Sequence, residues 1–303
     1  MADQNVNDPS GVYAHTLRIV YFVLSACGLT FSSILLLILG KKLRKSKHSD
    51  IILTILAVSV DCVASGGLLF RAIFTQYPYN MLKEHFGWCA YDAFFNSLIL
   101  AYSGYILSIL SLQRMLLIVF NFRINIWFWL GIAILMTFSL WGQAIYLNVN
   151  KNAQLSIIGV FCIAKNNAMG KPFYLTLMTC TLATYSLTII SYLSIIIFSC
   201  KQCLNQLSLN LDKAVVYREC RIIIFKSLLF LVPYMLIYSG RMYTWFYEFS
   251  TGKQRTWTME YVSVTMISSC VVVNCLTVLY MHKEVNKDLI KWFVKFKSLF
   301  HHE

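Results

Sequence analysis

Four polar side chains stand inside stretches of sequence that are otherwise apolar: Asp61, Ser103, Arg114 and Asn274. The carboxylate of Asp61, the hydroxyl of Ser103 and the amide of Asn274 could together coordinate a hydrated sodium ion, because oxygen ligands suit a hard cation. The alternative for Asp61 is a protonated carboxyl that is hydrogen-bonded across helices. Arg114 lies near the end of its stretch, where it could simply extend to the aqueous interface.

Two of the ten cysteines, Cys89 and Cys162, differ from most of the others because they lie at or beyond the ends of apolar stretches. On the oxidising side of a membrane they could form a disulfide that joins the third stretch to the loop after the fourth. Two unpaired thiols are the alternative. The sequence contains no His-Glu-x-x-His motif of a membrane hydrolase, so we do not expect an enzyme.

The composition requires lipid as part of the solvent. The chain is 58% hydrophobic and 13% charged, with a mean hydropathy of +0.63, whereas a soluble domain carries about 25% charged residues. A spanning helix needs roughly 20 apolar residues. We therefore predict an all-α membrane protein, a seven-transmembrane helix bundle. The expected spans are 16–40, 50–74, 87–120, 125–149, 173–200, 215–242 and 257–282.

The basic residues predict how this bundle is oriented. The net charge is +13, and the Lys and Arg residues cluster at the ends of apolar stretches, which indicates anionic lipid headgroups as partners and no nucleic acid. Fifteen of those at or beyond the ends of the spans fall on the side of the C-terminus and six on the other side, and the positive side is normally cytoplasmic. We expect an extracellular N-terminus (1–15), a membrane domain (16–282) and a cytoplasmic segment (283–303) with a short amphipathic interfacial helix.

The spacing of several residues resembles that of rhodopsin-like (family A) G-protein-coupled receptors. Cys89 and Arg114 are 25 residues apart, and the segment 108–118 is similar to the "SxxxDRYLAI" pattern of that family. The segment 274–285 resembles "NPxxYxxxxKxF", and Pro233 matches the proline of the sixth span. These similarities extend over nearly the whole chain.

The resemblance assigns roles by position. It implies that Cys162 pairs with Cys89, and that Asp61 and Ser103, together with Asn274, form an allosteric sodium site. The residues that would contact a heterotrimeric G protein are Gln113, Arg114, Tyr192, Lys213, Tyr217 and Arg218. The residues that would line an extracellular ligand cup are Asn96, Leu100, Tyr234, Met235, Tyr238 and Ser268. For the aromatic residues, helix packing is the alternative.

The sequence also departs from the family, as in an atypical member. Gln113 replaces the acid before Arg114, and Leu231, Cys275 and Val278 replace a tryptophan, a proline and a tyrosine. Loss of the acid should weaken the restraint on the inactive state, whereas loss of the tyrosine should weaken the active state. Ser268 stands where a light sensor carries its lysine, so we expect no retinal.

We therefore expect a receptor in the plasma membrane that transmits the signal of a small extracellular ligand to a G protein. No cofactor is expected beyond the sodium ion. A degenerate seven-helix receptor that does not signal is one alternative, and a small-solute transporter is another. A transporter would require several ionisable groups along a wet pathway, and the middle of the expected spans contains essentially only Asp61.

Overall fold

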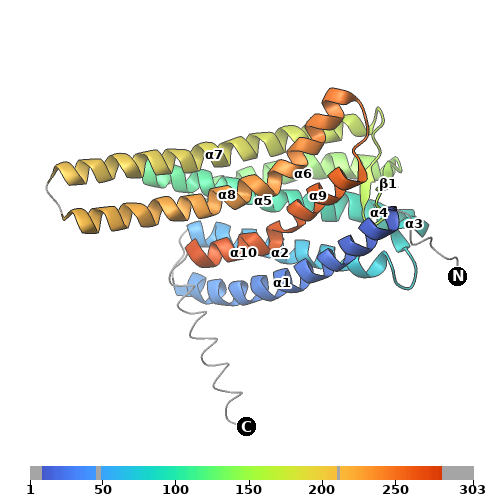
Figure 1. Cartoon of the computed structure of the whole chain (residues 1–303), viewed down its shortest axis with the longest axis horizontal. Helices are drawn as coiled ribbons and strands as arrows, with labels where there is room; N and C mark the ends of the chain where they lie inside the picture. Colours follow the sequence, from blue (N-terminus) through green and yellow to red (C-terminus); the bar gives the residue numbers. More distant parts are fainter. Residues whose placement is uncertain (1–8, 46–48, 210–211, 282–303) are drawn as a thin grey trace, which may run out of the picture.

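The apolar stretches fold as helices, because a segment surrounded by lipid must satisfy its own backbone N–H and C=O groups. The computed structural model of the chain describes residues 9–45, 49–209 and 212–281. In these ranges seven helical segments are long and apolar enough to cross a membrane, which confirms the predicted seven-helix bundle (Figure 1). The expected interfacial helix in 283–303 lies outside the described residues.

Five spans are single helices: α1 (Pro9–Lys45), α2 (Ser49–Phe74), α6 (Ile126–Val149), α7 (Gly170–Ser208) and α8 (Lys213–Thr251). The third span runs through α4 (Phe86–Tyr91), the π-helical η1 (Asp92–Asn96) and α5 (Ser97–Val119). The seventh runs through α9 (Trp257–Ser268) and α10 (Cys270–Met281), and a short α3 (Met81–Glu84) precedes the third.

Three helices extend well beyond the spans expected from hydropathy. α7 and α8 have 39 residues each, where the apolar stretches predicted 173–200 and 215–242, and α1 begins and ends outside 16–40. A helix of 39 residues is about 58 Å long, which exceeds the roughly 30 Å of a hydrocarbon core. Hydropathy finds only the part in lipid, whereas helical hydrogen bonding continues into the polar flanks.

Several helix ends are fixed by capping residues. Asn125, Asp212 and Thr256 accept hydrogen bonds from the backbone N–H groups of Trp127, Ala214 and Met259, respectively, at the starts of α6, α8 and α9. These side chains satisfy donors that have no partner within the helix. Gly252 ends α8 with a φ of 64°, a left-handed conformation that glycine adopts without steric cost.

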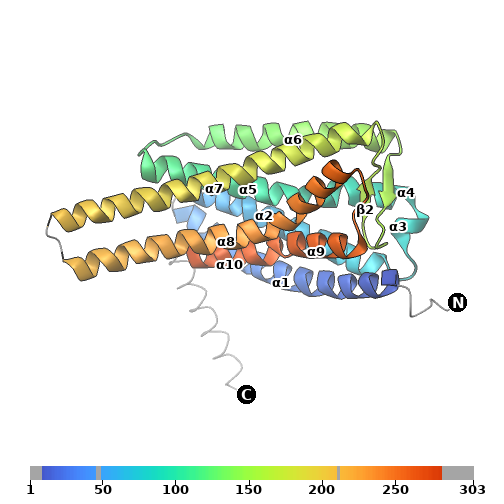
Figure 2. The same ribbon diagram turned by 45° about the horizontal axis from the view of Figure 1, so that its top comes forward.

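The third span lies at the centre of the bundle and is the most buried of the seven. α5 packs against α2, α6 and α7, while α1, α2 and α10 lie side by side in a second group, as Figures 1 and 2 show from two directions. α8 connects α7 to the seventh span and contains Pro233 within the helix. A proline there removes a backbone hydrogen bond and disturbs the helix locally.

One end of the bundle carries a two-stranded antiparallel hairpin. Strands β1 (Ala153–Leu155) and β2 (Cys162–Ala164) pair with Leu155 opposite Cys162. The N-terminal end of α1 lies at the same end, and the C-terminal end of α7 and the start of α8 lie at the other (Figure 1). We refer to these as the hairpin end and the opposite end.

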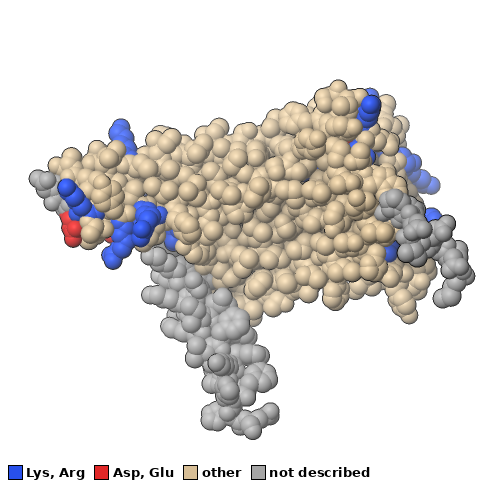
Figure 3. All heavy atoms as spheres, viewed as in Figure 1, with Lys and Arg blue, Asp and Glu red and all other residues tan. Residues whose placement is uncertain are grey.

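The surface of the bundle supports a position in lipid. Large apolar side chains such as Phe22, Leu135, Phe138, Ile197 and Leu236 are exposed along the helices. On the face drawn in Figure 3, lysine and arginine side chains gather at the two ends, and the broad region between them has no charged residue in view. An apolar belt between charged ends is the expected surface of a multi-pass membrane protein.

Candidate functional site

Asp61, Ser103 and Asn274 meet in the interior of the bundle, on α2, α5 and α10. Ser103 Oγ donates a hydrogen bond to Asp61 Oδ1. Asn274 Nδ2 lies 3.2 Å from Asp61 Oδ1 and 2.9 Å from Ser103 Oγ. All three residues are buried, and Asp61 Oδ2 has no hydrogen-bond partner among the described residues. The structure thus brings together the three side chains that the sequence singled out.

This cluster has the chemistry of a hard-cation site. The carboxylate of Asp61 and the hydroxyl of Ser103 offer oxygen ligands, and Oδ2 retains free acceptor capacity. Asn274 directs its amide N–H groups at the other two residues, so its carbonyl oxygen would have to turn to join a coordination shell. The residues fit a sodium ion that is held mainly by α2 and α5.

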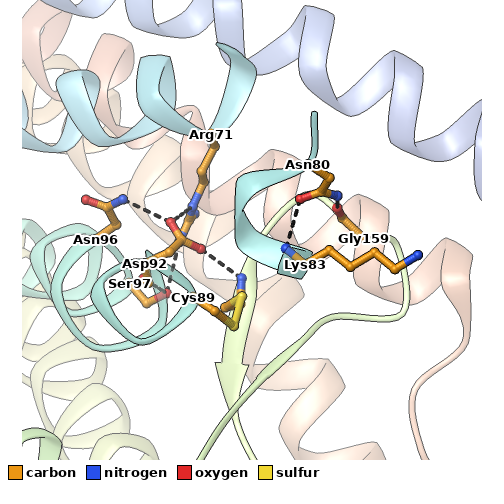
Figure 4. The surroundings of a disulfide bond; sticks show 9 residues. Arg71, Asn80, Lys83, Cys89, Asp92, Asn96, Ser97 and Gly159 are labelled. Carbon is orange, nitrogen blue, oxygen red and sulfur yellow. Dashed lines mark hydrogen bonds and ion pairs between the residues drawn. A yellow bond between two sulfur atoms is a disulfide. The ribbon is translucent and has the colours of Figure 1, made fainter. Parts of the chain in front are cut away.

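A second polar centre lies at the hairpin end, around the disulfide. Cys89 of α4 and Cys162 of β2 are bonded, which confirms the predicted pair. Asp92, one turn after Cys89, accepts from the backbone N–H of Cys162 at 2.8 Å and from Arg71 Nε at 2.7 Å. Arg71 also donates to Ser97 Oγ at 3.0 Å (Figure 4). The loop, α2 and the third span are therefore held by one buried ion pair and one covalent bond.

This centre includes Asn96, which had been expected in the ligand cup. Asn96 Nδ2 donates to Asp92 Oδ1 at 2.9 Å. Leu100, Tyr234 and Tyr238 are buried in a common apolar core, with the rings of Tyr234 and Tyr238 4.7 Å apart. These contacts are those of helix packing.

Two other expected ligand residues lie elsewhere. Ser268 is buried at the end of α9, and its Oγ has no hydrogen-bond partner among the described residues. Met235 is 37% exposed, while its neighbour Tyr234 is buried. The structure therefore does not place Met235 with Tyr234 and Tyr238, because a rotation of 100° per residue turns it away from the face of α8 that packs inward.

The opposite end contains the expected G-protein residues. Arg114 Nε forms an ion pair with Asp50 Oδ1 at 3.0 Å, and Gln113 Nε2 donates to Ser49 Oγ at 2.6 Å. Both contacts tie the end of α5 to the start of α2. Arg114 therefore has a carboxylate partner on another helix, although the residue before it is Gln113, and it does not simply extend toward water.

The remaining expected residues at this end fall into a buried and an exposed group. Tyr192 is buried on α7, with its ring stacked on Phe230 at 4.5 Å. Lys213, Tyr217 and Arg218 are exposed near the start of α8. Tyr217 and Arg218 line a surface pocket of about 760 Å³. The structure does not bring this exposed group into contact with Arg114.

A pocket at the hairpin end was not anticipated from the sequence. It has a volume of about 490 Å³ and lies between the hairpin and helices α7, α8 and α9. Its walls include Tyr174, Trp245, Glu248, Arg255 and Glu260. Glu260 is fully buried although it follows closely after the start of α9, where an acidic residue would ordinarily be solvated.

Two of the charged residues that were not singled out above could have been recognised from the sequence. Asp92 is the only acidic residue in the third span, and Arg71 is the only basic one in α2. A single charge inside a span requires a partner, so each could have been flagged. The pairings of Asp50, Arg255 and Glu260 depend on helix rotation and on the course of a loop, which spacing alone does not specify.

Comparison of the sequence with protein-family models gave no matching family, and comparison with curated proteins gave no match either.

Proposed function

We propose that this chain is a receptor in the plasma membrane that couples binding of an extracellular ligand to a heterotrimeric G protein. The convergence of Asp61, Ser103 and Asn274 carries the proposal. The resemblance to rhodopsin-like receptors required residues of three helices, far apart in sequence, to meet at one point. If the motifs matched by chance, there would be no reason for these three side chains to be in contact.

The orientation follows from two independent features. The disulfide between Cys89 and Cys162 forms readily on the extracellular side, because the cytosol keeps thiols reduced. The opposite end carries most of the Lys and Arg residues of the loops, which favours the cytoplasm. Both features support a hairpin end outside the cell and an Arg114 that lies at the cytoplasmic end.

The proposed mechanism is a shift between two arrangements of the bundle. A ligand outside would favour one arrangement because it binds that arrangement more tightly. In the resting arrangement, Arg114 is paired with Asp50 and the ends of α5 and α2 are joined. Release of Arg114, with movement of the cytoplasmic end of α8, would expose the surface to which a G protein binds.

The central test measures basal signalling with a panel of G-protein dissociation sensors in cells. We expect Asp50→Asn to raise the basal signal several-fold over the wild type, because it removes the charge that restrains Arg114. The double variant Asp50→Asn with Arg114→Ala should return to the background of untransfected cells. All variants are compared at matched surface expression.

Arg123→Ala is the matched control, since Arg123 is an exposed arginine at the same end of the bundle. It should leave the signal of Asp50→Asn unchanged. A raised signal that persists after Arg114→Ala would exclude Arg114 from the G-protein surface. Background signals in every variant would favour the non-signalling receptor.

One observation favours that second candidate, a seven-helix receptor that binds a ligand but does not signal. Cys275 and Val278 pack with Leu35, Leu39 and Val58 in a small apolar core at the opposite end. Neither side chain provides the hydroxyl that the family's tyrosine contributes to the active arrangement. The transporter alternative predicts uptake of a labelled solute, which a flux assay on reconstituted vesicles would detect.

A further inference from the structure

The pocket at the hairpin end contains a buried carboxylate whose ion pair, among the described residues, is a long one. Glu260 is 1% exposed, and neither of its carboxylate oxygens has a hydrogen-bond partner among the described residues. Its nearest ion-pair partner in that part of the chain is Arg255, with Nε at 3.9 Å from Oε1. A buried carboxylate without hydrogen bonds is strongly destabilising, so a donor that comes from outside the chain is expected at this point.

An unpartnered donor lies in the same pocket. Arg255 is 7% exposed and directs its Nε to Glu248 Oε1 at 2.9 Å. Its Nη1 is buried and has no hydrogen-bond partner within the described ranges. Lys171 also lines the pocket, at the exposed start of α7. The region around Arg255 and Lys171 can therefore accept an anionic group.

The remaining walls are largely aromatic. Tyr174, Trp245 and Phe249 line the pocket, and Tyr174 uses its hydroxyl to donate to the carbonyl of Ala164 at 2.6 Å, which leaves its ring as the available surface. The volume of about 490 Å³ is in the range of pockets that enclose small ligands. The ligand thus needs an apolar body in addition to its polar groups.

The balance of charges distinguishes among the ligand classes. The pocket is lined by two basic residues, Lys171 and Arg255, and two acidic ones, Glu248 and Glu260. A simple cation would satisfy Glu260 and leave Arg255 Nη1 buried without an acceptor. A simple anion would satisfy Arg255 Nη1 and leave Glu260 without a donor. A molecule with both charges provides a donor to Glu260 and an acceptor to Arg255 Nη1 at the same time.

We propose that this pocket binds a small zwitterion of the aromatic amino-acid class. Its ammonium group would donate to Glu260, its carboxylate would accept from Arg255 and Lys171, and its ring would lie against Trp245 and Tyr174. The role of such a molecule as the extracellular signal rests on the proposed receptor function, whereas its binding does not.

Binding is measured on the purified full-length chain in lipid nanodiscs by isothermal titration calorimetry. The probes are L-phenylalanine, 2-phenylethylamine, which lacks the carboxylate, and 3-phenylpropionate, which lacks the ammonium. We expect L-phenylalanine to bind and each analogue to bind at least about tenfold more weakly, because 2-phenylethylamine loses the charge-assisted contacts to Arg255 and Lys171, and 3-phenylpropionate loses the contact to Glu260. Failure of L-phenylalanine to bind, or equal binding of either analogue, overturns the proposal.

Variants assign the two charges to their residues. Glu260→Gln should lower the affinity for L-phenylalanine at least about tenfold. Glu84→Gln, the same change at an exposed residue of α3, should leave that affinity unchanged. Lys171→Gln changes an exposed side chain, so the variant is expected to fold. It should lower the affinities for L-phenylalanine and 3-phenylpropionate and leave the affinity for 2-phenylethylamine unchanged. Equal affinities for L-phenylalanine in the wild type and in Lys171→Gln would show that the carboxylate of the ligand does not contact Lys171.

The sensors described above separate this proposal from the proposed function. Binding of L-phenylalanine without a G-protein signal would retain the pocket and reject the receptor function. A basal signal that depends on Arg114, together with no binding of any probe, would retain the receptor function and reject the pocket.

Discussion

Asp61 is a buried carboxylate whose second oxygen has no hydrogen-bond partner among the described residues. If Asp61 and Ser103 bind sodium, the folded chain should be stabilised by sodium chloride and not by choline chloride. At a sodium concentration of about ten times the dissociation constant, the stabilisation would be about 1.4 kcal/mol. We expect this difference in a thermal melt of the detergent-solubilised protein, and we expect Asp61→Asn to abolish it.

Ser103→Ala is the informative companion to that variant. It removes one oxygen ligand and the hydrogen bond to Asp61, so it should weaken the sodium response without eliminating it. Asp212→Asn replaces a carboxylate that caps α8 at the opposite end and should leave the response intact. If sodium raises the midpoint of thermal unfolding equally in the wild type and in Asp61→Asn, the ion binds elsewhere.

At the residue scale, the sequence predicted best where fixed spacing constrained the result. Cys89 with Cys162, and Asp61 with Ser103 and Asn274, were found because four of them stand at a particular depth in a span and Cys162 lies in the middle of the loop between α6 and α7. The ion pairs of Arg71, Arg114 and Arg255 were not found. A basic side chain reaches several neighbours, and the choice among them depends on rotations of whole helices about their axes, which one sequence leaves open.

At the element scale, α1 and α2 approach each other closely at one position. A Cβ added at Gly28 would lie 2.3 Å from Ser65 Oγ and 3.0 Å from Val271 Cγ2. We therefore expect Gly28→Ala to destabilise the bundle by about 1–3 kcal/mol, because overpacking forces the neighbouring side chains or helices apart. A lower midpoint in thermal unfolding would measure the effect.

The reciprocal variant tests whether the cause is steric. Ser65→Gly removes both Ser65 atoms nearest to the added methyl group, so Gly28→Ala with Ser65→Gly should be more stable than Gly28→Ala alone. Gly40→Ala on the same helix meets no atom within 4 Å and should be neutral or slightly stabilising. Equal losses at Gly28 and Gly40 would exclude close packing as the reason.

The boundaries of the helices were predictable to different degrees. α2 and α6 match the expected 50–74 and 125–149 within one residue, because their apolar stretches end abruptly in polar sequence. α7 and α8 were underestimated, since helices continue where lipid ends. The division of the seventh span next to Ser269 and the π-helical η1 were not predicted, because neither interrupts the hydropathy.

At the scale of the whole molecule, the third span connects the disulfide centre, the Asp61 cluster and the Arg114 ion pair. Asp92 lies at the hairpin end, Ser103 in the interior, and Arg114 at the opposite end. In the proposed receptor, a small rotation or shift of this span would change the contacts of all three at once. Energetic coupling through a packed element with two arrangements is a physical route from one side of the membrane to the other.

That route has a direction only if the hairpin end is outside the cell. We expect an epitope tag at the N-terminus to be stained on intact cells, and a tag at the C-terminus to be stained only after permeabilisation. Replacement of Lys41, Lys42 and Arg44 by glutamine should turn a fraction of the chains around, because cytoplasmic Lys and Arg residues near the first spans set the orientation. The same replacement of Lys83, Lys151 and Lys165 at the hairpin end should not. An N-terminal tag that is hidden on intact cells would place the disulfide and the zwitterion pocket inside, and it would contradict an extracellular ligand.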